Sequence, residues 1–273
     1  MNLFGLAGVV CRTFDNSYSS SASQVVMVKD GQSRDVVTRL DMDLHDAVLN
    51  YVEQSSVGTG VLSEEGSSRS NNSFWEETDL LVLDPLDGSN NVALGLPGYC
   101  FMAAHVLDRR LTSSLVVLPE YDLYLIWQEG KLFASRNISF GSSAESSSTY
   151  YAYPPRLGDE DERIRAKIWQ AVDQNSSGLY RTGSAGIGLF HLLRGAHKAF
   201  VGHRVRVWDV LAYFPILQGA GFEIRYRIDG NTATAVASRD SDFVNEIRKI
   251  FGDQCSFWLT EYDQQAPIVT DQQ

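Results

Sequence analysis

One segment constrains this chain more than any other. Residues 84–90, Asp-Pro-Leu-Asp-Gly-Ser-Asn, directly follow the apolar run 80–83. A short apolar run bounded by turn residues is typical of a buried strand. The proline fixes the backbone and the glycine frees it, so Asp84 and Asp87 can converge on one small volume. Two like charges held so close need a counter-charge, usually a divalent metal. The segment therefore predicts a strand that runs into a metal-binding turn.

The chain has 273 residues, enough for one large domain or two closely packed halves. A serine-rich stretch over 137–149 is the best candidate for a boundary. We therefore expect an N-terminal α+β subdomain over 1–145 and a C-terminal α/β subdomain over 146–273. The first would carry most of the metal ligands, and the second would carry Asp209 and the substrate-pocket residues.

The net charge of −11 argues against a nucleic acid polymer as partner, because there is no basic excess to neutralise phosphates. A small anionic substrate is still possible, since a bound metal can reverse the local field. The three cysteines, Cys11, Cys100 and Cys255, lack metal-site spacing and fit a reducing compartment. No apolar run approaches membrane-spanning length, and the N-terminus lacks the basic start of a signal peptide. These features predict a cytoplasmic protein with no membrane partner.

Periodicity predicts a mixture of helices and antiparallel strands. A first helix is expected over 2–15, and apolar positions spaced three and four apart predict an amphipathic helix from Asp41. Further helices are expected around 164–172, from Gly183, over 207–220 and over 241–251. Segment 25–28 is expected to be a short strand or the end of a helix. Segments 100–107, 112–118 and 122–127 are expected to be strands that form a meander. The fold class predicted from this pattern is α+β, or a layered sandwich.

Acidic residues recur near the ends of these elements, and each has a plain structural interpretation. Asp41 suits a helix N-cap, Glu64 and Glu65 a solvated turn, and Asp209 the first turn of a helix. Taken together they suggest a metal site, because Mg²⁺ takes oxygen ligands. Two or three Mg²⁺ ions could be held by these groups: Glu64, Asp84, Asp87, Asp209 and the carbonyl of Leu86. A metal pair can activate water for in-line displacement at phosphorus, with Ser89 orienting that water.

The combination of Ser63-Glu64-Glu65, Asp84 to Ser89, and Trp208-Asp209 followed by Gly219-Ala220-Gly221 resembles the inositol monophosphatase / fructose-1,6-bisphosphatase superfamily. Its members are Mg²⁺-dependent, lithium-sensitive phosphatases, commonly homodimers. The resemblance runs from about Lys29 to the C-terminal helix and implies a layered αβαβα sandwich.

The resemblance also implies roles for individual residues. It makes Glu64, Glu65, Asp84, Asp87, Asp209 and the Leu86 carbonyl metal ligands. Ser89 would activate water with Asp41, and Glu64 would belong to the same catalytic group. Lys29 would lie near the phosphate, which the backbone N–H groups of Gly88 and Ser89 would receive. Gly183, Ser184 and Ala185 would line the substrate pocket.

Two regions depart from the family pattern. After Asp209 the family has small residues, but here Leu211, Tyr213 and Phe214 are bulky, and Pro215 should kink or shorten the helix. This puts the shape of the substrate pocket in doubt. Before Asp209 the chain carries Arg204 and Arg206. They suit a second anionic group or a sugar oxygen, or else an exposed basic strand edge.

The expected function is Mg²⁺-dependent hydrolysis of a small phosphorylated metabolite, either an inositol monophosphate or a sugar phosphate such as fructose 1,6-bisphosphate. The same chemistry could act on 3′-phosphoadenosine 5′-phosphate or on histidinol phosphate. A phosphatase of the haloacid dehalogenase type needs aspartates two apart, and here they are three apart. A non-catalytic relative serving as a binding module is the remaining alternative.

Overall fold

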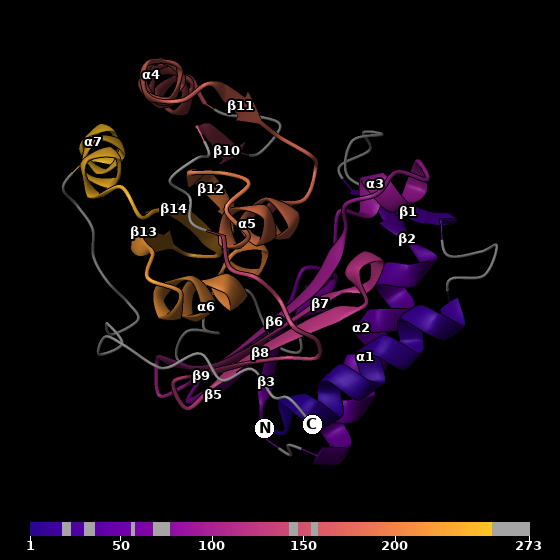
Figure 1. The fold of residues 1–273 in the computed structure, drawn as a ribbon. Helices are drawn as coiled ribbons and strands as arrows, with labels where there is room; N and C mark the ends of the chain where they lie inside the picture. The colour runs from indigo at the N-terminus through magenta and orange to yellow at the C-terminus, as the bar shows by residue number, and fades with distance from the viewer. Residues whose placement is uncertain are drawn as a thin grey trace.

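The computed structural model describes residues 1–17, 23–29, 36–55, 58–67, 77–141, 147–153 and 158–252. The described residues form alternating layers of helix and sheet (Figure 1). The layer order is α1 and α2, a seven-stranded sheet, α5 and α6, a five-stranded sheet, and α4 with α7. This arrangement confirms the predicted α+β sandwich. None of the described helices is long and apolar enough to cross a membrane.

The first layer consists of two amphipathic helices. Helices α1 (Leu3–Ser17) and α2 (Arg39–Ser55) pack on each other and on the seven-stranded sheet, which confirms both predicted helices. A small antiparallel pair, β1 (Val25–Val28) and β2 (Val36–Thr38), precedes α2.

The seven-stranded sheet has the order β4-β3-β5-β6-β7-β8-β9 and is antiparallel except for the β3–β5 pair. Its strands are β3 (Gly60–Ser63), β4 (Gly66–Ser67), β5 (Asp79–Asp87), β6 (Cys100–Leu107), β7 (Arg110–Leu118), β8 (Leu123–Gln128) and β9 (Lys131–Ala134). Short helices α3 (Ser89–Ala93) and η3 (Pro119–Tyr121) follow β5 and β7. The predicted meander is confirmed, and β9 extends it beyond the segments recognised in the sequence.

The five-stranded sheet has the order β11-β10-β12-β14-β13. Its strands are β10 (Ser148–Ala152), β11 (Gly178–Tyr180), β12 (Ala199–Arg206), β13 (Glu223–Asp229) and β14 (Thr232–Ser238). Helices α4 (Asp159–Asn175) and α7 (Ser241–Phe251) cover its outer face, and α5 (Ala185–Leu193) lies on the inner face (Figure 1). All three helices confirm predictions. The division into subdomains at residue 145 stays a prediction, and that residue lies outside the described ones.

The single helix expected over 207–220 is wrong. The chain instead forms two 3₁₀ turns, η4 (Val207–Asp209) and η5 (Leu211–Tyr213), followed by the short helix α6 (Phe214–Gly219). Pro215 occupies the first turn of α6, where its missing N–H costs nothing. The proline therefore starts a new helix, which is how it shortens the expected one.

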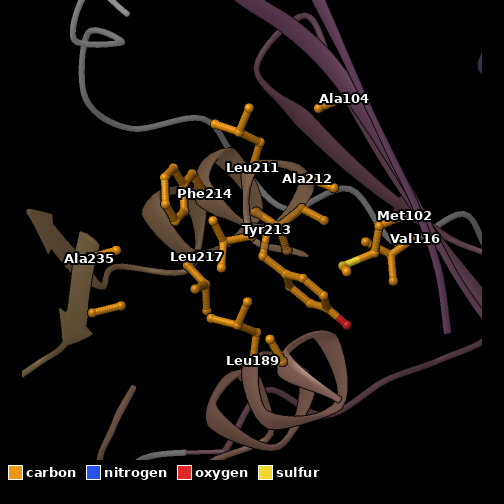
Figure 2. Packing of buried hydrophobic residues seen from close by; sticks show 14 of the residues in the cluster. Met102, Ala104, Val116, Leu189, Leu211, Ala212, Tyr213, Phe214, Leu217 and Ala235 are labelled. Carbon is orange, nitrogen blue, oxygen red and sulfur yellow. The ribbon is translucent and has the colours of Figure 1, made fainter. Parts of the chain in front are cut away.

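The bulky residues after Asp209 build the middle layer. Leu211, Tyr213 and Phe214 are buried in the core cluster between the two sheets. Figure 2 shows the Tyr213 ring between the helix that carries Leu189 and the strands that carry Met102 and Val116. The Tyr213 hydroxyl is buried and has no hydrogen-bond partner within the described residues.

This hydroxyl gives a stability prediction. A buried polar group without a partner carries a desolvation cost of about 1–3 kcal/mol. Tyr213→Phe removes that group and keeps the ring, so we expect the free energy of unfolding in urea to rise or stay equal. Tyr150→Phe is the matched control, because the Tyr150 hydroxyl donates to the Ser184 carbonyl (2.7 Å) and accepts from Thr182 N (3.1 Å). The control should lower the free energy of unfolding; a larger loss in Tyr213→Phe would contradict the prediction.

Candidate active site

Parallel pairing between β3 and β5 brings the first acidic residues together. Ser63 pairs with Leu83, so Glu64 follows β3 at the same edge where Asp84 continues β5. The Glu64 N–H donates to the Leu83 carbonyl at 3.1 Å, which fixes this alignment. Glu64 and Glu65 form the turn between β3 and β4. Being in a turn is therefore compatible with being metal ligands.

A bulge, and not a turn, brings Asp84 and Asp87 together. Strand β5 continues to Asp87, with Asp84 opposite Met102 and Asp87 opposite Cys100. Three steps on β5 therefore match two steps on β6. In a regular strand, residues three apart point to opposite faces, but one extra residue restores the same face. Both carboxylates consequently point toward the middle layer. The expected turn begins only after Asp87.

Asp209 completes the acidic cluster from the other half of the chain. It ends η4, which packs on β5. Its Oδ2 accepts a hydrogen bond from the Arg206 N–H at 3.1 Å. Carboxylate oxygens of Glu64, Asp84 and Asp209 all lie within 4.8 Å of one another. The structure thus brings together three residues, distant in the chain, that the sequence analysis had grouped as metal ligands.

The donor set suits a hard divalent cation. The three groups supply only carboxylate oxygens, the ligands that Mg²⁺ prefers. Asp84 Oδ1 accepts a hydrogen bond from the Leu86 N–H (3.0 Å), whereas Oδ2 is buried and has no hydrogen-bond partner in the described part of the chain. A buried carboxylate oxygen is normally paired or bound to a metal. The orphaned Oδ2 therefore fits a metal ligand.

Burial and mutual repulsion disfavour the charged forms of Asp84 and Asp209. Desolvation raises the pKa of Asp84 well above its ordinary value, and the charges of Glu64 and Asp87 raise it further. Desolvation likewise raises the pKa of Asp209, with Asp87 and Glu64 adding to the effect. Without a cation, burial and repulsion therefore favour the protonated forms of Asp84 and Asp209. A cation would displace those protons, so its binding should strengthen with pH.

Asp87 is held by the start of α5. Its Oδ2 accepts hydrogen bonds from Ser184 Oγ (2.8 Å) and from the Gly186 N–H (2.5 Å). Burial raises the pKa of Asp87 to about 7, although the Gly186 and Ser184 hydrogen bonds oppose the rise. Ser184 also caps α5 by accepting from the Ile187 N–H at 3.1 Å. The predicted pocket residue Ser184 is thus buried and fixes a candidate metal ligand.

Asp41 and Ser89 form the pair that the sequence suggested. Ser89 Oγ lies 2.6 Å from Asp41 Oδ1 and 2.9 Å from the Leu86 carbonyl, either of which can accept its proton. Asp41 is not the helix cap: its Oδ2 accepts from the N–H of Thr38, the residue before α2, at 2.7 Å. Burial raises the pKa of Asp41, while the Ser89 and Thr38 hydrogen bonds oppose the rise.

Two glycines permit close backbone approaches beside this pair. Gly88 has a φ of 106°, and a Cβ there would meet the Gly98 carbonyl oxygen at 2.7 Å. Gly183 has a φ of 85°, and a Cβ there would meet Asn91 Oδ1 at 3.1 Å. Asn91 Nδ2 joins the two halves by donating to the carbonyls of Gly98 (2.7 Å) and Thr182 (2.9 Å). The neighbouring Ala185 begins α5 and is buried.

Lys29 supplies a positive charge beside Glu64 and Glu65. Its Nζ contacts Glu64 Oε1 at 2.8 Å and Glu65 Oε1 at 3.0 Å. Burial disfavours the ammonium, but the two glutamates outweigh burial and hold the pKa of Lys29 above its ordinary value. Desolvation raises the pKa of Glu65 to about 7, against the influence of Lys29. The predicted phosphate-end lysine thus contacts two predicted metal ligands.

The two arginines before Asp209 point to different places. The Arg206 guanidinium contacts Asn231 Oδ1 at 3.0 Å, and its backbone N–H holds Asp209. Arg204 pairs with Asp161 Oδ2 on α4 at 3.0 Å. Because α4 covers the outer face of the five-stranded sheet, Arg204 lies away from the acidic cluster. The structure therefore does not place Arg204 beside the other predicted site residues.

Sequence reasoning missed two residues around the site. Thr38 anchors Asp41, and the spacing Thr38-x-x-Asp41 before an apolar-periodic run is the signature of a capping box, which could have shown it. Cys100 is buried with its Sγ 3.9 Å from Asp87 Oδ2. Only the pairing register of β5 and β6 brings it there, so no local signal could have found it.

Comparison with known proteins gives the class. The inositol monophosphatase family profile matches residues 4–247. The chain is 21% identical over 196 residues to a fructose-1,6-bisphosphatase/inositol-1-monophosphatase of Thermotoga maritima, covering 69% of this chain and 70% of that one. It is 26% identical over 195 residues to the Nus factor SuhB of Xylella fastidiosa, covering 68% and 67%.

A solved structure shows the same fold. An IMPase/NADP phosphatase complexed with Mg²⁺ and phosphate superposes with a TM-score of 0.73 at 16% identity, covering 92% of this chain and 95% of that one. Fold and family profile therefore agree. The chain belongs to the inositol monophosphatase family, whose members are phosphatases that hydrolyse phosphate monoesters.

The crowded carboxylates predict an unusual effect of removing one. The raised pKa of Asp84 means that the folded, metal-free protein binds protons more tightly than the unfolded chain, so its free energy of unfolding falls as pH rises above about 4. Asp84→Asn keeps the oxygen that accepts from Leu86 and removes this charge. We expect a melting temperature higher than wild type by about 2 °C or more at pH 7.5 in chelator, with the gap closing toward pH 4.

Asp46→Asn is the matched control, because Asp46 is exposed on α2. It should melt like wild type at both pH values. With saturating Mg²⁺ the order should reverse, since wild type gains stability by binding and Asp84→Asn does not. Asp84→Asn melting below wild type in chelator would contradict the electrostatic argument.

Proposed function

We propose that this protein is a Mg²⁺-dependent phosphomonoesterase of a small phosphorylated metabolite, an inositol monophosphate or a sugar phosphate. One observation carries the proposal: the carboxylates of Glu64, Asp84 and Asp209 converge beside the Asp41–Ser89 hydrogen bond. Glu64, Asp84, Asp87, Asp209 and the Leu86 carbonyl would hold Mg²⁺, with Glu65 beside them. When bound, Mg²⁺ neutralises charge on the phosphate and makes water a better nucleophile.

The residues of the chain would supply the proton path. Ser89 Oγ, 2.6 Å from Asp41 Oδ1, can accept a proton from the attacking water while passing its own to Asp41. Burial raises the pKa of Asp41, which makes its carboxylate a stronger base. The water oxygen then bonds to phosphorus as the bond to the ester oxygen breaks, and the departing oxygen takes a proton from solvent water. Gly88 and Ser89 at the start of α3 would orient the phosphate, and the Ser184 hydrogen bond would keep Asp87 aligned.

A second candidate is a binding role without turnover. The similarity to the Nus factor SuhB favours it, as does the contact of Lys29 with Glu64 and Glu65, where a cation would otherwise be expected. The intact Asp41–Ser89 pair favours catalysis, because a metal-binding module alone has no need of it. Lithium inhibition and a homodimeric state also stay proposals, supported by the family resemblance. A cytoplasmic location stays a proposal, supported by the sparse cysteines.

A phosphatase panel tests the choice. The substrates are inositol 1-phosphate, fructose 1,6-bisphosphate, 3′-phosphoadenosine 5′-phosphate and histidinol phosphate, each with Mg²⁺, with Mg²⁺ plus Li⁺, and with chelator. We expect phosphate release from an inositol or sugar phosphate with Mg²⁺ alone, and loss of it with lithium or chelator. Mg²⁺ binding by calorimetry without turnover on any substrate would favour the binding role instead.

Ser89→Ala tests the proton path. Losing a positioned general acid–base group should lower kcat by about 10²-fold or more, while Mg²⁺ affinity and melting temperature change little. Ser55→Ala is a suitable control, because Ser55 is exposed at the end of α2 and bonds only the Tyr51 carbonyl among the described residues. If Ser89→Ala retained near-normal kcat, the Asp41–Ser89 pair would not be part of the proton path.

A further inference from the structure

A polar cavity lies on the outer face of the five-stranded sheet, away from the acidic cluster. It has a volume of about 150 Å³ and is lined by residues from α4, β12, β13, β14 and α7. A site needs about 10–15 Å³ to hold one water, so this cavity has room for a group of several atoms. Its wall includes arginine, threonine, aspartate and histidine side chains, which makes it a candidate site for a polar ligand.

A bulge in β12 places Arg204 in this cavity. Gly202 pairs with Ala235 and Val205 with Ala233, so three steps on β12 match two on β14. Both Ala233 and Ala235 belong to the middle-layer core, so Gly202 and Val205 face inward. The extra residue turns Arg204 outward with a φ of 52°, a conformation that costs energy for an arginine. The Arg204 N–H donates to Thr234 Oγ1 at 3.2 Å.

His203 also lines the cavity and carries an unsatisfied atom. Its side chain is 3% exposed, and Nε2 lies 3.3 Å from Asp161 Oδ1. Burial lowers the pKa of His203, which favours the neutral ring. With its proton on Nε2, Nδ1 is an acceptor, and it has no hydrogen-bond partner among the described residues. A ligand hydroxyl could satisfy it.

Arg227 is a cavity-lining cation whose side chain makes no ion pair among the described residues, although Asp229 lines the same cavity at its exposed rim. It lies on β13, is half-buried, and lines the cavity opposite Thr234, its partner in the sheet. Arg204 is paired with Asp161, but Arg227 has no ion pair or hydrogen bond from its side chain within the described residues. An unpaired, half-buried guanidinium in a chain with a net charge of −11 calls for an anionic partner.

We propose that this cavity binds a small phosphorylated metabolite that carries hydroxyl groups. The phosphate would contact Arg227 and Arg204, since guanidinium forks match phosphate oxygens. Hydroxyls on the organic part would donate to the acceptors at the cavity wall, His203 Nδ1 and the Asp161 carboxylate. The site uses no metal and lies on the opposite face of the sheet from the middle layer. It stands independently of the proposed phosphatase activity.

Calorimetry on the full-length chain tests the site, with fructose 6-phosphate and inorganic phosphate as probes. In chelator the acidic cluster repels anions, so binding reports on the cavity alone. We expect fructose 6-phosphate to bind more tightly than inorganic phosphate. Arg227→Gln should weaken binding by about tenfold or more, because it removes a charge-assisted contact. Arg163→Gln, which removes an exposed charge from α4 outside the cavity wall, should bind like wild type.

Asp229→Asn gives a change of opposite sign that misfolding cannot imitate. Asp229 is exposed at the cavity rim, so losing its charge should tighten phosphate binding by about two- to fivefold. No binding to wild type in chelator, or equal binding to Arg227→Gln and wild type, would overturn the proposal. Equal affinity for both probes would overturn the hydroxyl contacts. Titration with Mg²⁺ present separates the two sites, since only the acidic cluster gains affinity from the metal.

Discussion

One extra residue in β5 determines where the acidic cluster forms. Without the bulge between Asp84 and Asp87, one carboxylate would point to the α1–α2 layer and the other to the middle layer. With it, Leu86 stays in the apolar cluster under α1 and α2, and both carboxylates face the middle layer. The parallel neighbour β3 then brings Glu64 to the same edge. A local irregularity of backbone pairing thus concentrates charge at the junction of the two sheets.

The surrounding residues stabilise most of these carboxylates through hydrogen bonds. Asp87 is satisfied by the hydroxyl and amide at the start of α5, and Asp41 by Ser89 and Thr38. Asp84 has one oxygen left over. Hydrogen bonds fix the carboxylates of Asp87 and Asp41 in position, whereas Asp84 keeps a buried oxygen that a cation can bind.

The sequence predicted most helices and the acidic cluster, but not the structure after Asp209. Helices α1, α2, α4 and α7 follow from apolar periodicity, because each buries one face on a sheet. Helix α5 is buried almost all round and was predicted from its start near Gly183. The acidic cluster followed from residue types near element ends, since carboxylates need a counter-charge wherever they meet. The region after Asp209 failed because its residues are apolar all round. Periodicity cannot separate a helix from 3₁₀ turns when Leu211, Tyr213 and Phe214 are all buried in one layer between two sheets.

The position of Arg204 shows why the remainder could not be predicted. Alternation along β12 would put Arg204 on the inner face, with Gly202 and Val205 on opposite faces, and proximity in sequence would put it near Asp209. The bulge reverses that expectation. Strands β5 and β12 therefore both contain a β-bulge, with one extra residue between two inward-facing positions. In β5 it gathers two carboxylates on the inner face, and in β12 it sends an arginine to the outer one. A bulge depends on the register of the partner strand, which is a long-range property, so the face of a side chain beyond it cannot be read from its own strand.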